Sequence, residues 1–311
     1  MTEPAEHSVE LRLRDELVRG DATVAGAGPV LRHLLAHDDH ALFGDETIAR
    51  VRGMIAHLAA QLLFARGEAA GADDLADYVT ERQDDLAQAL CEDAAILAHA
   101  HALTIEAQLA ELLQSRSGID AVLPPLVQER AAAGDANLAA LAMAVLAAQA
   151  RFMQQHRRME LPLGELPGEL FHQVLMLHRA HGADDEAVAE EAERRLRAAY
   201  DEGAARLSLL ARLVMGDADG VLELDNAGVA IFATGLAMAS SQERDRVVLA
   251  LADRQSARLA LSLRAAGLAH PAVERQLLHV RAETALPESF DLLAADRAAA
   301  LLAAARAEAA L

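Results

Sequence analysis

The chain has 311 residues, a formal net charge of −20 and a single cysteine, and 53% of its residues are hydrophobic while only 3% are aromatic. Every one of the 28 basic residues is arginine, which excludes a Walker-type phosphate loop, a Schiff-base lysine and a Ser/Lys dyad, because each needs an ammonium group. The negative charge disfavours nucleic acid as a partner, and the lone Cys91 excludes an internal disulfide and a cysteine-based zinc site.

Apolar residues recur at helical spacing along almost the whole chain, and period-2 alternation of β-branched residues is almost absent. This pattern predicts an all-α fold: a multi-helix array that is either α-solenoid-like or an irregular helical bundle. The N-terminal residues are acidic where a signal peptide is basic, and the longest near-apolar run, Ala227 to Ala239, is too short for a bilayer, which needs about 20 residues. We therefore expect a cytoplasmic protein that does not enter membranes.

The predicted helices follow one another with short interruptions. Thr104 before Ile105 is a typical N-terminal capping residue, so we expect a new helix there. In chain order, the helices are expected over residues 5–19, 29–37, from Asp45 to about 62, 73–102, 105–115, 122–133, 136–158, 168–181, 185–215, 226–239, 242–253, 255–266, 271–283 and 288–309.

Two of these segments have a clear amphipathic pattern. After Asp45, which we expect to cap the helix, apolar residues recur every three or four positions at Ile48, Val51, Ile55, Leu58 and Leu62. In 185–215, three acid-first pairs at i, i+4 predict a solvated face: Glu190 with Arg194, Glu191 with Arg195, and Glu193 with Arg197. The apolar stripe of 185–215 could pack against a second copy, which would make the protein a homo-oligomer.

Two other segments lack a polar face. Residues 138–148 and 227–239 are almost wholly apolar, and a helix without a polar face must be surrounded, so we expect both at the centre of the core. Between them, Pro162, Gly164 and Pro167 interrupt the helical pattern. We therefore expect an N-terminal helical region over 1–160 and a C-terminal one over 168–311, unless the two form one continuous domain.

The first candidate metal site is the group His33, His37 and His40. The i, i+4 spacing places the first two imidazoles on one helical face, and His40 follows after two aspartates. Two histidines with a carboxylate form a known ligand set. The alternative is that these histidines lie at a helix C-terminus, where an imidazolium ion interacts favourably with the negative end of the helix dipole.

The second candidate is Glu169 with His172, which matches half of the di-iron signature of ferritin-like proteins. The other half of that signature does not occur in the chain. His178 and His181 share a face with each other, whereas His172 and His178 do not. The alternative is that these are surface or helix-end histidines, and we expect no cofactor.

Three C-terminal stretches have a familiar order. They are Phe232-Ala233-Thr234-Gly235-Leu236, then Arg246 to Asp253, then Leu259 to Leu268. These residues resemble the C-terminal helices of the alphaproteobacterial domain of unknown function 2336. The resemblance covers about 50 residues, and it implies a bacterial helical-repeat protein without an assigned activity or catalytic residues.

Helices without a catalytic cluster are typical of a non-enzymatic scaffold. We therefore expect a helical scaffold or regulatory protein–protein interaction module of a bacterial cytoplasm, binding a basic or amphipathic protein partner in a groove with acidic rims. The alternative is a helical metal-binding enzyme or sensor that uses a His/carboxylate centre drawn from the two candidate groups.

Overall fold

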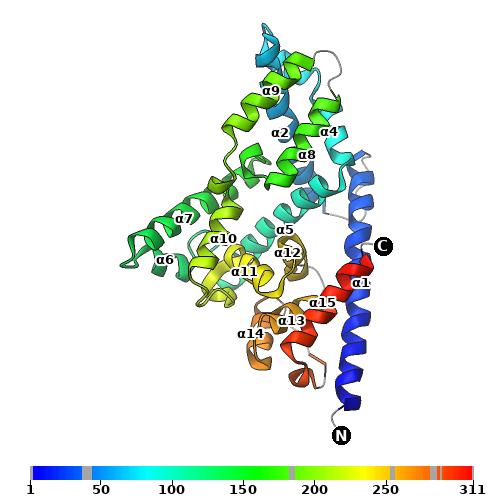
Figure 1. Ribbon diagram of the computed structural model, residues 1–311, viewed down its shortest axis with the longest axis vertical. Coiled ribbons are helices and arrows are strands. Elements are labelled where there is room, and N and C mark those ends of the chain that lie inside the picture. Colours follow the sequence, from blue (N-terminus) through cyan, green and yellow to red (C-terminus); the bar gives the residue numbers. More distant parts are fainter. Residues whose placement is uncertain are drawn as a thin grey trace. The chain divides into compact units, whose positions relative to one another are not determined.

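The computed structural model describes residues 3–36, 44–181, 186–252, 256–280, 286–287 and 289–309 (Figure 1). Within these ranges the chain forms fifteen α-helices and three short 3-10 helices, and it contains no β-strand. The predicted all-α fold is confirmed, in the form of a multi-helix bundle.

The helices form two compact units that are interleaved along the chain. Unit 1 comprises Met1–Ala27, Ile105–Leu146 and Leu210–Leu311, and unit 2 comprises Gly28–Thr104 and Ala147–Leu209. Each unit therefore draws on both of the regions, 1–160 and 168–311, that the sequence separates. Four helices are divided between the units: α1 (Glu3–Ala36), α5 (Ala94–Ser117), α7 (Ala136–Arg157) and α10 (Arg206–Gly216).

Unit 2 is built around α2 (Asp45–Ala70). Helices α3 (Leu75–Thr80), α4 (Gln83–Glu92) and α9 (Glu186–Ala199) pack on α2, and α8 (Gly168–His181) packs on α4. The predicted apolar stripe of α2 is confirmed, because all five of its residues are buried: Ile48, Val51, Ile55, Leu58 and Leu62. The N-cap is Gly44 rather than Asp45, whose carboxylate lies in the first turn, where it opposes the helix dipole.

The interruption at residues 160–168 is an ordered, partly buried segment. The short helix η1 (Leu163–Glu165) lies within it, and Leu161, Leu163 and Leu166 are buried. The Gln61 side chain of α2 donates to the Leu161 carbonyl at 2.9 Å and accepts from the Leu163 amide at 3.0 Å. Proline and glycine end the helical pattern as expected, but hydrogen bonds and burial fix this segment to α2.

Unit 1 is built around α11 (Leu224–Ser240). Helices α6, α12, α13 and α14 pack on α11, and α15 packs on α13. The bounds of these five helices are α6 (Pro125–Ala131), α12 (Arg244–Ala252), α13 (Ser256–Ala265), α14 (His270–Val280) and α15 (Ala295–Ala309). Thirteen residues of α11 are buried, Phe232 completely, so the prediction that 227–239 is central to the core is confirmed. The short helices η2 (Glu202–Ala204) and η3 (Phe290–Leu292) belong to units 2 and 1, respectively.

Helix α11 approaches its neighbours closely through glycine. A Cβ atom at Gly235 would lie 2.0 Å from Val221 Cγ1, so only glycine fits without a shift. Gly228 has φ 68° and interrupts the helical dihedrals beside Pro124, a conformation that other residues rarely adopt. The kink and the close contact together explain how an apolar helix of this length is enclosed.

Several predicted helix boundaries are wrong. The segment 5–19 and the described residues 29–36 of the next segment belong to one continuous helix, α1, which passes through Gly20 despite the weak helix propensity of glycine. The segment 73–102 is divided into α3, α4 and the start of α5, and Asp93 caps α5 by accepting from the amides of Ala95 and Ile96. Thr104 is not a cap, since its hydroxyl donates to the Ala100 carbonyl inside α5.

The segment 185–215 is also not one helix. Its described part forms α9, η2 and α10, and the break falls where the Asp201 side chain accepts from the Gly203 amide. The Arg206 amide then donates to the Glu165 carboxylate at 2.8 Å, which fixes the start of α10. The Asp201 and Glu165 carboxylates therefore accept from amides at the starts of η2 and α10, which replace the single predicted helix near Gly203.

Helix α7 differs from the prediction that it lies at the core. Only 28% of its most apolar 18-residue window is buried, and Met143 is 52% exposed. Among the described residues, α2 and α7 are long and apolar enough to span a membrane by length and composition, a test that core helices of soluble proteins also pass. An apolar helix was expected to be surrounded, but only six of the 22 residues of α7 are buried and eight are exposed.

Candidate functional site

The second predicted metal group lies on α8, and it does not converge on one point. Glu169 and His172 are exposed, whereas His178 is buried. His172 Nδ1 lies 3.2 Å from Nη2 of Arg197 on α9. A guanidinium group only donates hydrogen bonds, so Nδ1 accepts and this ring nitrogen is already used. Within the described ranges, no group of three or more His, Cys, Asp or Glu residues is placed to hold a metal ion.

The first predicted metal group lies outside what the structure describes. His33 belongs to the backbone of α1 but its side chain is not described, and His37 and His40 fall in the undescribed stretch 37–43. The prediction of a site at these three histidines therefore stays a prediction.

Arginine and glutamate side chains join α8 to α9. Arg179 of α8 contacts the carboxylates of Glu186, Glu190 and Glu193 on α9. Of the three pairs expected within α9, Glu191 with Arg195 and Glu193 with Arg197 are confirmed. The prediction that Glu190 pairs with Arg194 is wrong. Glu190 contacts Arg179 of α8, and Arg194 contacts Glu191.

His178 is the buried ionisable group of α8. The pKa of His178 is lowered from 6.5 to about 4, chiefly by burial and also by the charges of Arg66 and His181, while Glu193 acts in the opposite direction. Its Nε2 atom has no hydrogen-bond partner among the described residues. The ring is therefore neutral at physiological pH.

The hollows of unit 2 give little room for chemistry. An open groove of about 360 Å³ between α4 and α8 is lined by Glu92, Asp93 and His181 among others. The Asp93 carboxylate is already engaged, because it caps α5 and accepts from the Gln173 side chain. A second hollow beside Arg206 has a volume of about 20 Å³, which suffices for roughly one water molecule.

The interior of unit 1 contains an arginine centre that the sequence did not reveal. Arg244 of α12 forms two hydrogen bonds of 2.8 Å with the Glu106 carboxylate of α5, and its Nε donates to Thr234 of α11 at 2.9 Å. Burial disfavours the charge, but Glu106 outweighs it and raises the pKa of Arg244. Glu106 is 1% exposed. The two guanidinium NH₂ groups face the carboxylate in parallel, and we call this bidentate pair the Arg244–Glu106 clamp.

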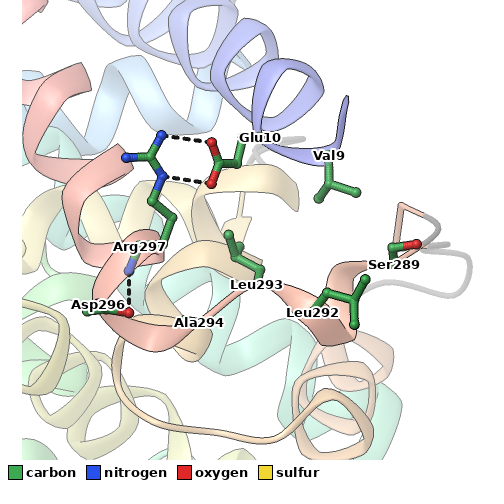
Figure 2. Close-up of a pocket in the computed structure, with 8 residues that line it drawn as sticks. All are labelled: Val9, Glu10, Ser289, Leu292, Leu293, Ala294, Asp296 and Arg297. Atoms are coloured by element: carbon green, nitrogen blue, oxygen red, sulfur yellow. Dashed lines mark hydrogen bonds and ion pairs between the residues drawn. The ribbon is translucent and has the colours of Figure 1, made fainter. Parts of the chain in front are cut away.

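Helix α1 docks on unit 1 through one face. Val9, Leu13 and Leu17 are buried, and Asp21 continues the same ridge at the next interval of four residues. Glu10 forms two hydrogen bonds of 2.7 Å with Arg297 of α15 above a hollow of about 260 Å³ (Figure 2). Asp21 pairs with the buried Arg258 of α13, which also donates to Gln242 at 3.1 Å.

The other face of α1 is open to solvent. Leu11 and Val18 are 48% and 46% exposed, and their spacing of seven places them together on the side away from the ridge. Helix α1 therefore has one covered apolar ridge and one uncovered apolar stripe.

The exposed part of α7 in unit 1 is apolar apart from Asn137. Ala136, Ala140 and Met143 are exposed, and Leu141 and Leu146 are half-buried. No aspartate or glutamate occurs between Ala136 and Arg157, in a chain of net charge −20. We call the five apolar residues Ala136, Ala140, Leu141, Met143 and Leu146 the α7 surface.

Comparison with family models, curated proteins and solved structures found no match to this chain. The resemblance of its C-terminal helices to the domain of unknown function 2336 stays a prediction.

Proposed function

We propose that this protein is a non-enzymatic helical scaffold or regulatory module that binds other proteins in a bacterial cytoplasm. The observation that carries the proposal is the α7 surface, where Ala136, Ala140 and Met143 are exposed, Met143 by 52%. Uncovered apolar area of this kind marks interaction surfaces in soluble proteins. Binding a partner would remove this area from water.

The side chains of the exposed surface suit adaptable binding. Five large exposed residues are methionines: Met143, Met159, Met176, Met215 and Met238. Methionine is flexible and polarisable, so exposed methionines can repack against different partners. The α7 surface has no acidic residue, which favours a partner with an apolar, weakly charged surface there over the strongly basic partner that the net charge alone suggests.

The polar clusters support a non-enzymatic role. The Arg244 guanidinium is closed by Glu106 and Thr234, and the arginines of α8 and α9 are paired with glutamates. Such paired groups hold helices together and serve a structural role. The metal-binding alternative rests on His33, His37 and His40, and metal analysis of untagged protein with thermal-shift assays on zinc, iron and manganese tests it.

A position-specific crosslinking experiment tests the proposed function. A photo-reactive residue replaces Met143 in one variant and the exposed polar Asn137 of the same helix in a matched control, and both are irradiated in cells that produce the protein. We expect a discrete crosslinked partner from position 143 that is absent from position 137. Met143→Glu should abolish capture of this partner and Asn137→Glu should retain it, since only the former places a charge in the apolar contact.

Two results of the crosslinking experiment would overturn the proposal. Crosslinks from position 143 that match those from 137, or that survive Met143→Glu, would mean that the α7 surface does not select a partner.

A further inference from the structure

Helix α7 continues beyond the α7 surface with the same side exposed. From Met143 onward, exposed residues recur along the helix at intervals of three or four positions: Met143, Ala147, Arg151, Gln154 and Arg158. This spacing keeps them on one side of a helix. The exposed side of α7 therefore begins with the apolar residues of the α7 surface and ends with two arginines. We call Arg151 and Arg158 the α7 arginines.

The α7 arginines have no acidic partner. Neither forms an ion pair or a side-chain hydrogen bond with any residue that the structure describes, whereas each arginine of α9 in the same unit contacts a glutamate. The negative end of the helix dipole favours a cation in the last turn of α7, but Arg151 lies six residues before the last helical residue. Two guanidinium groups are thus left for an external anion, in a chain of net charge −20.

The spacing of the α7 arginines fits a second helix. They are seven residues apart, which corresponds to about 10.5 Å at a rise of 1.5 Å per residue. A helix that lies along α7 presents the same side again after seven residues, so carboxylates at positions i and i+7 face both guanidinium groups. Each guanidinium can bind a carboxylate through parallel hydrogen bonds, which fixes the register of the two helices.

We propose that the α7 arginines anchor the partner of the α7 surface, and that this partner is an amphipathic helix of another protein. Its apolar residues lie against Met143 and the rest of the α7 surface, and two carboxylates seven residues apart lie against Arg151 and Arg158. The inference rests on the proposed function, because it extends the same apolar contact. It adds that the partner helix is acidic at one end.

Other anions fit these observations less well. A nucleic acid or an anionic membrane carries negative charge over an area much larger than two arginines occupy, and either one repels a chain of net charge −20. A short helix places its carboxylates only at the arginines and buries its apolar side on the rest of α7. Charge complementarity therefore favours the acidic end of a helix.

A peptide-binding assay tests the anchor. The probe is a fluorescein-labelled peptide of about 20 residues, long enough to form a helix, with leucines every three or four positions in its first half. Its second half carries two glutamates seven residues apart, and a matched peptide carries glutamines at these two positions. Fluorescence anisotropy follows titration with the full chain. The glutamate peptide should bind about fivefold more tightly than the glutamine peptide, and high salt should reduce this preference.

Two double variants of the chain locate the preference. Arg151→Glu/Arg158→Glu should abolish it, whereas Arg116→Glu/Arg275→Glu, which changes the net charge equally on α5 and α14, should retain it. A peptide with arginines in place of the two glutamates should bind the first variant more tightly than the second. All four substituted arginines are exposed, so both variants should keep the circular dichroism spectrum of the unaltered chain.

Three results would contradict the anchor. The first is equal affinity of the unaltered chain for the glutamate and glutamine peptides. The second is a preference that survives Arg151→Glu/Arg158→Glu. The third is binding of phosphatidylserine vesicles to the unaltered chain but not to this variant, which would assign the α7 arginines to a membrane.

Crosslinking from position 143 separates this inference from the proposed function. A partner that is captured equally by the unaltered chain and by Arg151→Glu/Arg158→Glu would support the proposed function and contradict the anchor. If position 143 captures no partner, the proposed function fails, and the peptide assay measures the anchor independently. Failure of the proposed function and failure of this inference are therefore separate results.

Discussion

The two units differ in the burial of their charged side chains. Unit 1 places arginine–carboxylate pairs in its interior, where Arg244 meets Glu106 and Arg258 meets Asp21. Unit 2 displays a series of pairs on α9 at the surface and buries His178 in its neutral form. The number of pairs therefore says little about stability, because water screens the surface pairs and not the buried ones.

The largest expected effect is the removal of the buried acid of unit 1. Glu106→Gln leaves the Arg244 guanidinium in the interior without its countercharge, and we expect a loss of about 3–5 kcal/mol in the free energy of unfolding. The midpoint of urea denaturation measures this loss. Replacing both partners, as Glu106→Leu/Arg244→Met, should recover most of it, and a double variant as unstable as the single one would contradict the clamp.

The next effect belongs to unit 2 and depends on pH. The unfolded chain binds a proton at His178 below pH 6.5, and the folded chain does so only below about pH 4. Stability is therefore complete above pH 6.5 and falls as the pH drops, by about 3 kcal/mol over the window. The difference between the denaturation midpoints at pH 7 and pH 5 should be smaller in His178→Phe than in the unaltered chain.

The exposed His172 is the control for this pH dependence, and His172→Gln should retain it. An imidazole resonance of His178 that titrates near pH 6.5 in an NMR experiment would show that the ring is not held neutral by burial.

A smaller effect is expected where an interior pair lies at the edge of unit 1. Asp21→Asn removes the countercharge of Arg258, but α1 can lift and let water reach the guanidinium, which limits the loss to about 1–3 kcal/mol. Urea denaturation monitored by circular dichroism measures it. A loss as large as that of Glu106→Gln would mean that α1 cannot separate from α13.

The smallest effect is expected on the surface of unit 2. Glu191→Gln breaks the contacts with Arg194 and Arg195 on α9, which also lower the pKa of Glu191, yet all three side chains remain in contact with water. The denaturation midpoint should be unchanged within error at 0.15 M salt, because exposed pairs are screened. A clear destabilisation would reverse the contrast between the two units.

The sequence predicted the features that follow from the content and spacing of apolar residues. It did not predict those that depend on residues far away along the chain. The all-α class, the stripe of α2 and the burial of α11 follow from apolar spacing and content. Helix α7 has the same apolar content as a core helix, but content does not say whether other helices cover it. Helix ends such as that near Asp93 depend on which side chain accepts the free amides.

The polar clusters were missed for the same reason. Spacing along α8 shows which histidines share a face, but it does not reveal that Arg197 of α9 donates to His172. Glu106 and Arg244 are 138 residues apart, and no local pattern connects them. Glu106 stands among Thr104, Gln108 and Glu111, so the local sequence does not mark it as a buried charge.

The distance along the chain between α1 and the α13 residue with which it pairs has a consequence during synthesis. Asp21 leaves the ribosome 237 residues before Arg258, and at roughly 5–20 residues per second this delay is on the order of 10–50 s. Throughout that interval the apolar ridge of the nascent chain has no surface of its own to cover it.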